Sequence, residues 1–171
     1  IHRMVNDFST FTKMPRPIFE NITINKLILS SISMLRLANK KVAINSQIDK
    51  KKNINLKADP NLINQAFNNL AQNSLNSINE KYILVKNYKG KIIISLSVED
   101  NFCKLTMSDN GIDLPMNKEF LTEPYISRSK NGSGIGLAVV KKIMQDHNGN
   151  IELENNKNNI GAKVSLLFPL N

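Results

Sequence analysis

Three glycines on alternate positions, Gly132, Gly134 and Gly136, stand directly before a segment with a helical pattern. Without Cβ atoms, the backbone of such a loop can take positive φ and come close to a ligand. Apolar residues then recur three and four apart from Leu137 to Met144, which predicts an amphipathic helix. A glycine loop that leads into a helix presents N–H groups and the positive dipole end to an anion, most often a phosphate. The chemistry indicated is phosphate binding.

This loop is ambiguous by itself, because a glycine-rich turn before an ordinary packed helix has the same composition. It has neither the Gly-Lys-Ser/Thr ending of a P-loop nor the Gly-x-Gly-x-x-Gly opening of a dinucleotide-binding unit. The helix is predicted to end at His147 and Gly149, which form a C-terminal cap. Two further groups of polar residues, both upstream, bear on how the loop is interpreted.

Amide side chains form a row on the helix predicted from Asp59 to about Asn79. Asp59 is a typical N-cap and Pro60 a typical first helical residue. At about 100° per residue, the apolar and the amide residues fall on separate faces of this helix. The predicted buried stripe consists of Ile63, Phe67, Leu70 and Ile78, and the amide face consists of Gln65, Asn69, Gln72, Asn73 and Asn76.

The amide face has two interpretations. Asparagine is a poor helix former, so each one costs a few tenths of a kcal/mol relative to alanine, and a function could compensate for this. Amide oxygens are hard, neutral ligands that suit Mg²⁺, which takes few protein ligands beside substrate phosphates. The alternative is a solvated face in a chain that is rich in asparagine throughout.

A carboxylate follows a predicted strand in Asp109-Asn110-Gly111. The strand, Cys103 to Ser108, alternates in polarity and pairs in a predicted hairpin with Lys91 to Val98. A carboxylate at a strand end can accept a hydrogen bond from an exocyclic amine such as that of adenine. Asp, Asn and Gly are also common turn residues, so a plain turn is the alternative.

The remaining segments are assigned from their patterns. Glu119 to Asn131 has no clear periodicity and contains Arg128 and Lys130, which predicts a mobile lid over the site. A helix is predicted from Asn25, as its N-cap, to about Asn39, with an inward face of Leu27, Ile28, Ile32, Leu35 and Leu37. Short strands are predicted over residues 18–24, 42–48, 54–58, 150–155 and 162–168.

Composition narrows the class of protein. The 171 residues, 41% of them hydrophobic, can bury one core, so one main domain is expected. The net charge of +9 favours anionic partners, but the charges are spread along the chain and do not predict nucleic-acid binding. No apolar run approaches the roughly 20 residues of a membrane span. The single Cys103 excludes an internal disulfide and is predicted to be a core residue in a reducing compartment.

Taken in order, the asparagine helix, Asp-x-Gly at a strand end and Gly-x-Gly-x-Gly before a helix resemble the catalytic, ATP-binding domain of sensor histidine kinases. That domain has four short sequence motifs, called boxes. They are similar to Asn69-Leu-Ala-Gln-Asn73, Asp109-Asn-Gly111, Phe120-Leu-Thr-Glu-Pro-Tyr125 and Gly132-Ser-Gly134-Ile-Gly136. Each box is weak alone, but their order and spacing together are highly specific. Residues 8–17 and Glu123-Pro-Tyr further resemble the NtrY-type nitrogen-regulation sensor kinases.

The resemblance implies an α/β two-layer sandwich with the Bergerat-type ATP-binding fold of the GHKL superfamily, a mixed sheet covered on one face by three helices. ATP would lie between the helices and the lid. Carried over by position, Asn73 would coordinate Mg²⁺, and Asn69 would support the metal or its water. Asp109 would accept from the adenine amine, with Gly111 giving the base room.

The glycine loop and the lid would serve the phosphates in this resemblance. The backbone there would approach them at Gly132, Gly134, Gly136 and Leu137. Arg128 and Lys130 would neutralise the γ-phosphate. Because phosphoryl transfer is mainly positioning and electrostatics, no enzyme nucleophile is required in this chain.

The resemblance also divides the chain. Residues 1–17 resemble the tail of a dimerisation and phosphoacceptor helix with its hinge, and residues 18–171 the catalytic domain. The phosphoacceptor motif is missing, because neither His2 nor His147 has its context. The sequence opens without Met and in the middle of a helical pattern, so the chain is expected to be a fragment. The implied reaction moves the γ-phosphoryl group of ATP to a histidine on that hairpin, dimeric in the intact protein, and then to the aspartate of a response-regulator receiver domain. The implied location is cytoplasmic, as part of a membrane-anchored sensor.

The chain departs from the family pattern at one position, and two other functions stay open. Asp113 stands where the family usually has a second glycine, which places a negative side chain near the nucleotide and predicts weaker binding or altered geometry. A GHKL ATPase of the gyrase or chaperone type is one alternative, but it would carry a glutamate base at the position of Asn69. A degenerate module that only docks a regulator is the other.

Overall fold

The computed structural model describes residues 14–127, 133–157 and 160–170. Its main sheet has the strand order β2-β4-β5-β7-β6. These strands are β2 (Ala43–Gln47), β4 (Lys91–Glu99), β5 (Phe102–Asp109), β6 (Asn150–Asn155) and β7 (Ala162–Pro169). β2 is parallel to β4 and the other neighbours are antiparallel, so the sheet is mixed. The hairpin predicted from the alternating patterns is confirmed as β4 and β5.

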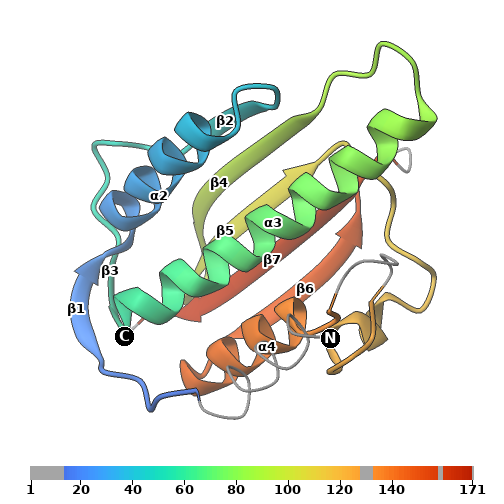
Figure 1. Ribbon diagram of the computed structural model, residues 1–171. Coiled ribbons are helices and arrows are strands. Elements are labelled where there is room, and N and C mark those ends of the chain that lie inside the picture. The colour runs from blue at the N-terminus through green and yellow to red at the C-terminus, as the bar shows by residue number, and fades with distance from the viewer. Residues whose placement is uncertain (1–13, 128–132, 158–159, 171) are drawn as a thin grey trace.

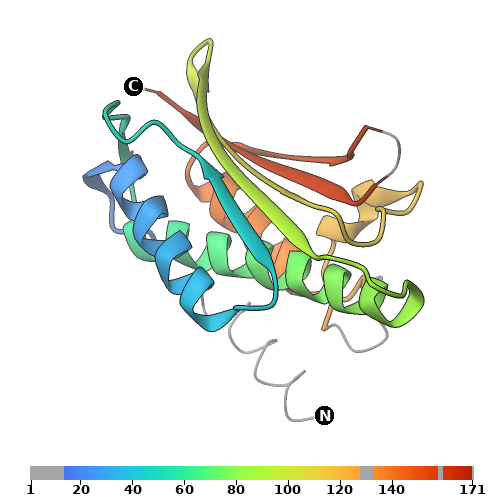
Figure 2. The same cartoon turned by 90° about the horizontal axis from the view of Figure 1, so that it is seen from above.

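Three helices cover one face of this sheet (Figures 1 and 2). They are α2 (Ile24–Ala38), α3 (Pro60–Leu84) and α4 (Gly136–Asp146), with α3 in the middle. A small second sheet pairs β1 (Glu20–Thr23) with β3 (Asn55–Ala58), and a 3₁₀ helix, η1, spans Lys118–Thr122. The predicted two-layer α/β architecture, with a mixed sheet under three helices, is therefore confirmed.

The core lies between the helices and the sheet. All four residues of the stripe predicted on α3 are buried, and they pack over the inner face of the strands, which carries Ile92, Ile94, Leu105 and Leu166. Cys103 is also buried there, as predicted, and burial raises the pKa of its thiol to about 12. In the described residues, no helix combines the length and the apolar character that a membrane span requires.

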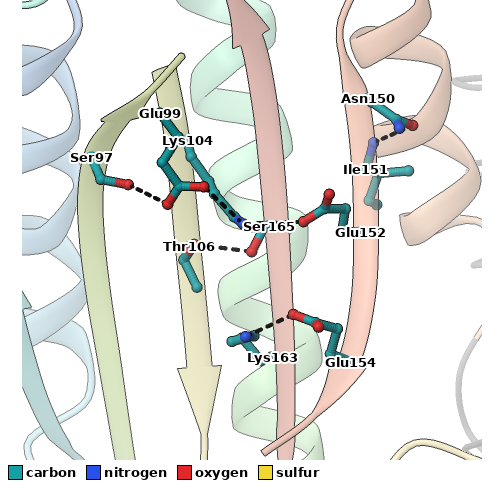
Figure 3. A network of polar contacts seen from close by, with 10 residues as sticks. All are labelled: Ser97, Glu99, Lys104, Thr106, Asn150, Ile151, Glu152, Glu154, Lys163 and Ser165. Atoms are coloured by element: carbon teal, nitrogen blue, oxygen red, sulfur yellow. Dashed lines mark hydrogen bonds and ion pairs between the residues drawn. The ribbon is translucent and has the colours of Figure 1, made fainter. Parts of the chain in front are cut away.

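The other face of the sheet is polar (Figure 3). Lys104 pairs with Glu99 at 3.3 Å and with Glu152 at 3.2 Å, and Lys163 pairs with Glu154 at 2.7 Å. The carboxylate of each pair is exposed, and ion pairs at the surface contribute only about 0–1 kcal/mol each. The asymmetry of the two faces explains why the strands alternate so clearly in sequence.

Two predictions on the first helix are wrong. α2 begins at Ile24, and Asn25 is buried inside its first turn instead of capping it. The Asn25 amide donates to the Asp49 carbonyl oxygen and accepts from the Ile54 N–H, so it holds the loop before β3. Leu37, predicted to face inward, is 70% exposed, because at about 100° per residue it lies about 140° around α2 from the buried Ile32.

α3 is longer than predicted. It continues past Asn79 to Leu84, although Ile83 and Leu84 are exposed. Lys81 and Tyr82, which lie in this extra turn, make hydrogen bonds to distant backbone. Lys81 reaches the turn after β5, and Tyr82 bonds to the backbone of Gly90 and Lys41. Tertiary contacts thus extend the helix beyond its predicted end.

The predicted end of α4 is confirmed, but its left-handed residue is Asn148 rather than a glycine. Asn148 has φ 53°, its N–H bonds to Gln145, and the Gly149 N–H bonds to Met144, which is the Schellman arrangement. His147 is 5% exposed and accepts from the Asp59 N–H through Nε2, so the neutral ring carries its proton on Nδ1 and donates to Ile143.

Asp59 joins several elements at the start of α3. Its carboxylate caps the helix by accepting from the N–H groups of Asn61 and Leu62, and it also accepts from the Ile18 N–H at 2.8 Å. Burial by itself would raise the pKa of this carboxyl, but the N–H donors of Ile18, Leu62 and Asn61 outweigh burial and hold the pKa below its ordinary value. The N-cap predicted from the sequence is confirmed.

We expect Asp59→Ala to lower the free energy of unfolding by about 2 kcal/mol at pH 7, the upper end for a lost N-cap. Since the folded-state pKa is lowered, the carboxylate stabilises the domain above its unfolded pKa of about 3.9, and this contribution is lost as the pH falls further. Urea denaturation from pH 7 to pH 3 should therefore show the difference between wild type and Asp59→Ala shrinking below about pH 4. Asp59→Asn, which keeps an oxygen at the cap, is expected to lose less, and a pH-independent difference would contradict the assignment.

Candidate functional site

The predicted asparagines meet Gly136 of the predicted glycine loop at the N-terminus of α4. Asn69 donates through Nδ2 to the Gln65 carbonyl oxygen at 2.9 Å, which fixes the orientation of its amide. A Cβ atom built on Gly136 would lie 3.1 Å from Asn69 Oδ1 and 3.8 Å from Asn73 Oδ1. Two amide oxygens of α3 therefore face the first turn of α4, where the helix N–H groups begin. The other amides differ, because Gln72 bonds to Asn76 on the exposed surface.

Asp109 is the last residue of β5, and it contacts α3 one to two turns beyond Asn69. It is 5% exposed and accepts from Ser74 Oγ at 2.9 Å, from Ser77 Oγ at 3.4 Å and from the Gly111 N–H at 2.9 Å. Both serines are buried on α3. The sequence reasoning did not identify them, although small hydroxyl residues three apart beside a buried stripe were a usable signal.

Gly111 is in close contact with the backbone of α3. A Cβ atom there would lie 2.2 Å from Ser77 Oγ and 2.7 Å from the Ser77 carbonyl carbon. No ordinary side chain fits at that distance, because backbone atoms cannot move aside as a side chain can. The structure thus gives a packing reason for this glycine, separate from the room for a base that the resemblance implies.

Asp113, the departure from the family pattern, is bonded to the β6–β7 connection. Its Oδ1 accepts from the Gly161 N–H at 2.6 Å. Gly161 has φ +80°, and a Cβ atom on it would lie 2.1 Å from the Asp109 carbonyl oxygen. Asn156 bonds to the same oxygen at 2.7 Å. The Asp113 side chain therefore helps to hold the turn after β5 against the end of the sheet.

The segment predicted as a lid is only partly irregular. It contains η1, in which Leu121 and Thr122 are buried. After η1, Tyr125 donates its N–H to the Gly134 carbonyl oxygen at 3.0 Å, and both residues have φ +68°. A Cβ on Gly134 would lie 2.7 Å from Tyr125, so the two predicted boxes pack directly on each other. Arg128, Lys130 and Gly132 lie outside the described residues.

Leu137 is the second residue of α4, and it packs against the core as a half-buried side chain. α4 is also tied to the lid segment, because Lys141 pairs with Glu123 at 2.7 Å. Of the predicted site residues that the structure describes, Gly136 lies beside Asn69 and Asn73 of α3, and Asp109 and Gly111 contact the same helix at Ser77.

Comparison with protein families identifies this arrangement. Residues 58–171, which include α3, the turn after β5 and the glycine loop, match the family described as histidine kinase-, DNA gyrase B-, and HSP90-like ATPases. The chain belongs to this family. The family resemblance inferred from the boxes is therefore confirmed, and the domain is of the ATP-binding type.

Individual relatives are sensor kinases. The chain is 30% identical to the nitrogen regulation protein NtrY of Azorhizobium caulinodans over 97% of its own length and 21% of that protein. Among solved structures, the nucleotide-free catalytic domain of histidine kinase ThkA matches with a TM-score of 0.75 at 23% identity, covering 89% of this chain and 95% of that one. ThkA in complex with the response regulator TrrA matches with a TM-score of 0.80 at 21% identity, covering 99% of this chain and 47% of that one.

These likenesses carry different weight. The solved structures show that the fold is that of histidine kinase catalytic domains. The chain spans about a fifth of the length of NtrY, so the activity and the partners of the whole protein are matters for proposal.

Proposed function

We propose that this chain is the ATP-binding kinase domain of a sensor histidine kinase. In this proposal it transfers the γ-phosphoryl group of ATP to a histidine on a phosphoacceptor hairpin, from which the group passes to the aspartate of a response-regulator receiver domain. The observation that carries the proposal is the layout of α3. One turn bonds to Asp109 through Ser74 and Ser77, and the preceding turns present Asn69 and Asn73 to α4.

That layout suits a nucleotide with its base and its phosphates at opposite ends. At the base end, the Asp109 carboxylate, which has about four lone-pair sites, would accept a hydrogen bond from the adenine amino group. At the other end, the phosphates would lie at the N-terminus of α4, where free N–H groups and the helix dipole favour anions. Arg128 and Lys130 would neutralise charge on the γ-phosphate.

The amide pair fits a magnesium ion. Asn69 Oδ1 and Asn73 Oδ1 both face the first turn of α4, and Mg²⁺ accepts one or two protein oxygens beside phosphate oxygens and water. Asn73 would coordinate the ion and Asn69 would support it or its water. The ion, when bound, would offset the negative charge of the phosphates during transfer.

Two observations weigh against the other functions. An ATPase needs a residue that activates water, and Asn69 is an amide whose NH₂ group is committed to Gln65. A degenerate module was suggested by the charge of Asp113, but that carboxylate accepts a hydrogen bond from Gly161 in the β6–β7 connection. A cytoplasmic location, in the cytoplasmic part of a sensor, is part of the same proposal.

The first experiment is calorimetric titration of the chain with a non-hydrolysable ATP analogue, with and without Mg²⁺. We expect binding that requires the metal. A second assay, with labelled ATP in place of the analogue, should show transfer of label to a separately added phosphoacceptor hairpin of an NtrY-type kinase. Release of phosphate at the same rate without the hairpin would instead indicate an ATPase. A folded chain that binds no nucleotide would indicate the regulator-docking module.

A further inference from the structure

The turn after β5 is held by a cation that none of the predicted boxes includes. Lys81, in the last turns of α3, donates through Nζ to the carbonyl oxygens of Asn110 at 2.8 Å and Gly111 at 2.9 Å. These are the two residues that directly follow Asp109. A hydrogen bond from a charged donor contributes more than one between neutral groups, so this contact restrains both peptide units of the turn.

Tyr88 supports the same turn from the segment between α3 and β4. Its hydroxyl lies 2.7 Å from the Asn110 carbonyl oxygen and 2.6 Å from Asn110 Oδ1. Both of these atoms are acceptors, so the phenol must keep its proton to bond to them. Burial, with the nearby charge of Asp109, raises the pKa of Tyr88 to about 12, which keeps it protonated. The Lys81 ammonium lies 5.4 Å from the centre of its ring, within cation–π range.

The restrained turn is connected to the Asp109 carboxylate. The Gly111 N–H donates to Asp109 Oδ1 at 2.9 Å, and the carbonyl of the same residue accepts from Lys81. A shift of the turn would therefore move the N–H group that orients the carboxylate. Ser74 and Ser77 fix the carboxylate from α3, and Lys81 fixes it through the turn from the end of the same helix.

We propose that Lys81, with Tyr88, is a positioning residue for base recognition: it holds the 109–111 turn so that Asp109 is oriented to accept a hydrogen bond from the amino group of adenine. This inference rests on the proposed function, and it goes beyond it by assigning the orientation of Asp109 to residues outside the boxes. Lys81 acts through the turn and does not touch the nucleotide. Its effect is therefore confined to recognition of the amino group.

The test compares two nucleotides that differ only in that group. Calorimetry with Mg²⁺ gives the affinity for ATP and for its purine analogue in which hydrogen replaces the 6-amino group. We expect wild type to prefer ATP about tenfold, which corresponds to about 1.4 kcal/mol. Lys81→Met, which keeps most of the apolar stem and removes the donors, is expected to bind both nucleotides equally well. Lys86→Met, on an exposed lysine just after α3, is the matched control and should keep the tenfold preference.

The outcomes separate this inference from the proposed function. If wild type binds neither nucleotide, the proposed function fails and the inference with it. If wild type prefers ATP and Lys81→Met keeps that preference, or if its affinities for the two nucleotides fall by the same factor, only the inference is overturned. Should thermal unfolding show that Lys81→Met does not fold, Tyr88→Phe decides, because it removes only a hydroxyl. A preference about threefold smaller than in wild type supports the inference, and an unchanged preference overturns it.

Discussion

Asn73→Ala is expected to abolish Mg²⁺-dependent binding of ATP and leave the domain folded. Asn73 is exposed, and its Oδ1 faces the first turn of α4. Removal of groups that only support a metal ligand typically costs about 10- to 100-fold in metal affinity, so loss of the ligand itself should cost at least about 100-fold. The domain should stay folded, because alanine is the better helix former by a few tenths of a kcal/mol. Titration with an ATP analogue, with and without Mg²⁺, measures the effect.

Asn68→Ala is the matched control for this variant. Asn68 lies on the same helix as Asn73, is also exposed, and is absent from the contacts at Gly136. It should bind Mg²⁺ and ATP as wild type does. Equal affinities in wild type and Asn73→Ala would show that the amide face is a solvated surface, which is the alternative that the composition allowed.

The local elements of the fold could be predicted because their signals are local. The Asp59-Pro60 pair marks the start of α3, and the buried stripe on that helix follows from the 3.6-residue repeat. The strands of the hairpin alternate because one face of the sheet is buried and the other carries ion pairs. In these segments the apolar pattern follows directly from which face of the element is buried, so the sequence is sufficient to predict the element.

Two of the errors have a different cause, which is contact between segments far apart in the sequence. Asn25 looks like an N-cap, yet it bonds to Asp49 and Ile54, which are 24 and 29 residues away. The final turn of α3 looks like a polar connection, yet Lys81 bonds across to the turn after β5. The periodicity within a segment carries no information about such distant hydrogen-bond partners. The boundary at residue 17 stays a prediction, because residues 1–13 lie outside the described part of the chain.

The sequence was enough to predict which types of residue form the candidate site, but not how these residues are arranged in space. Asn69, Asn73 and Asp109 were identified because amides and carboxylates have a recognisable chemistry. Ser74 and Ser77, which hold Asp109, have no such signature in sequence, and their role depends on the register of α3 against β5. The sequence also assigned Gly111 to the ligand, whereas the nearest atoms to its missing side chain belong to α3.

Gly111→Ala is the second large effect that we expect, and it tests that last difference. A methyl group at this position would lie 2.7 Å from the Ser77 carbonyl carbon and 2.8 Å from the Ile78 nitrogen, so the turn or α3 must shift. Overpacking typically costs about 1–3 kcal/mol, and a clash with backbone falls at the upper end or beyond. We expect the free energy of unfolding to fall by about 3 kcal/mol in the absence of any nucleotide, as measured by urea denaturation.

Gly136→Ala is the matched control, because its methyl group would meet the end of a side chain instead of backbone. The nearest atom is Asn69 Oδ1 at 3.1 Å, and this side-chain end needs to move by only a few tenths of an ångström. The variant should therefore fold with nearly the stability of wild type but bind Mg²⁺ and ATP more weakly. If Gly111→Ala kept its stability and lost only nucleotide binding, the glycine would be required to leave space for the base. The close packing of the turn on α3 would then not explain why a glycine stands there. The pair of variants thus separates a glycine required by the fold from one required by the site.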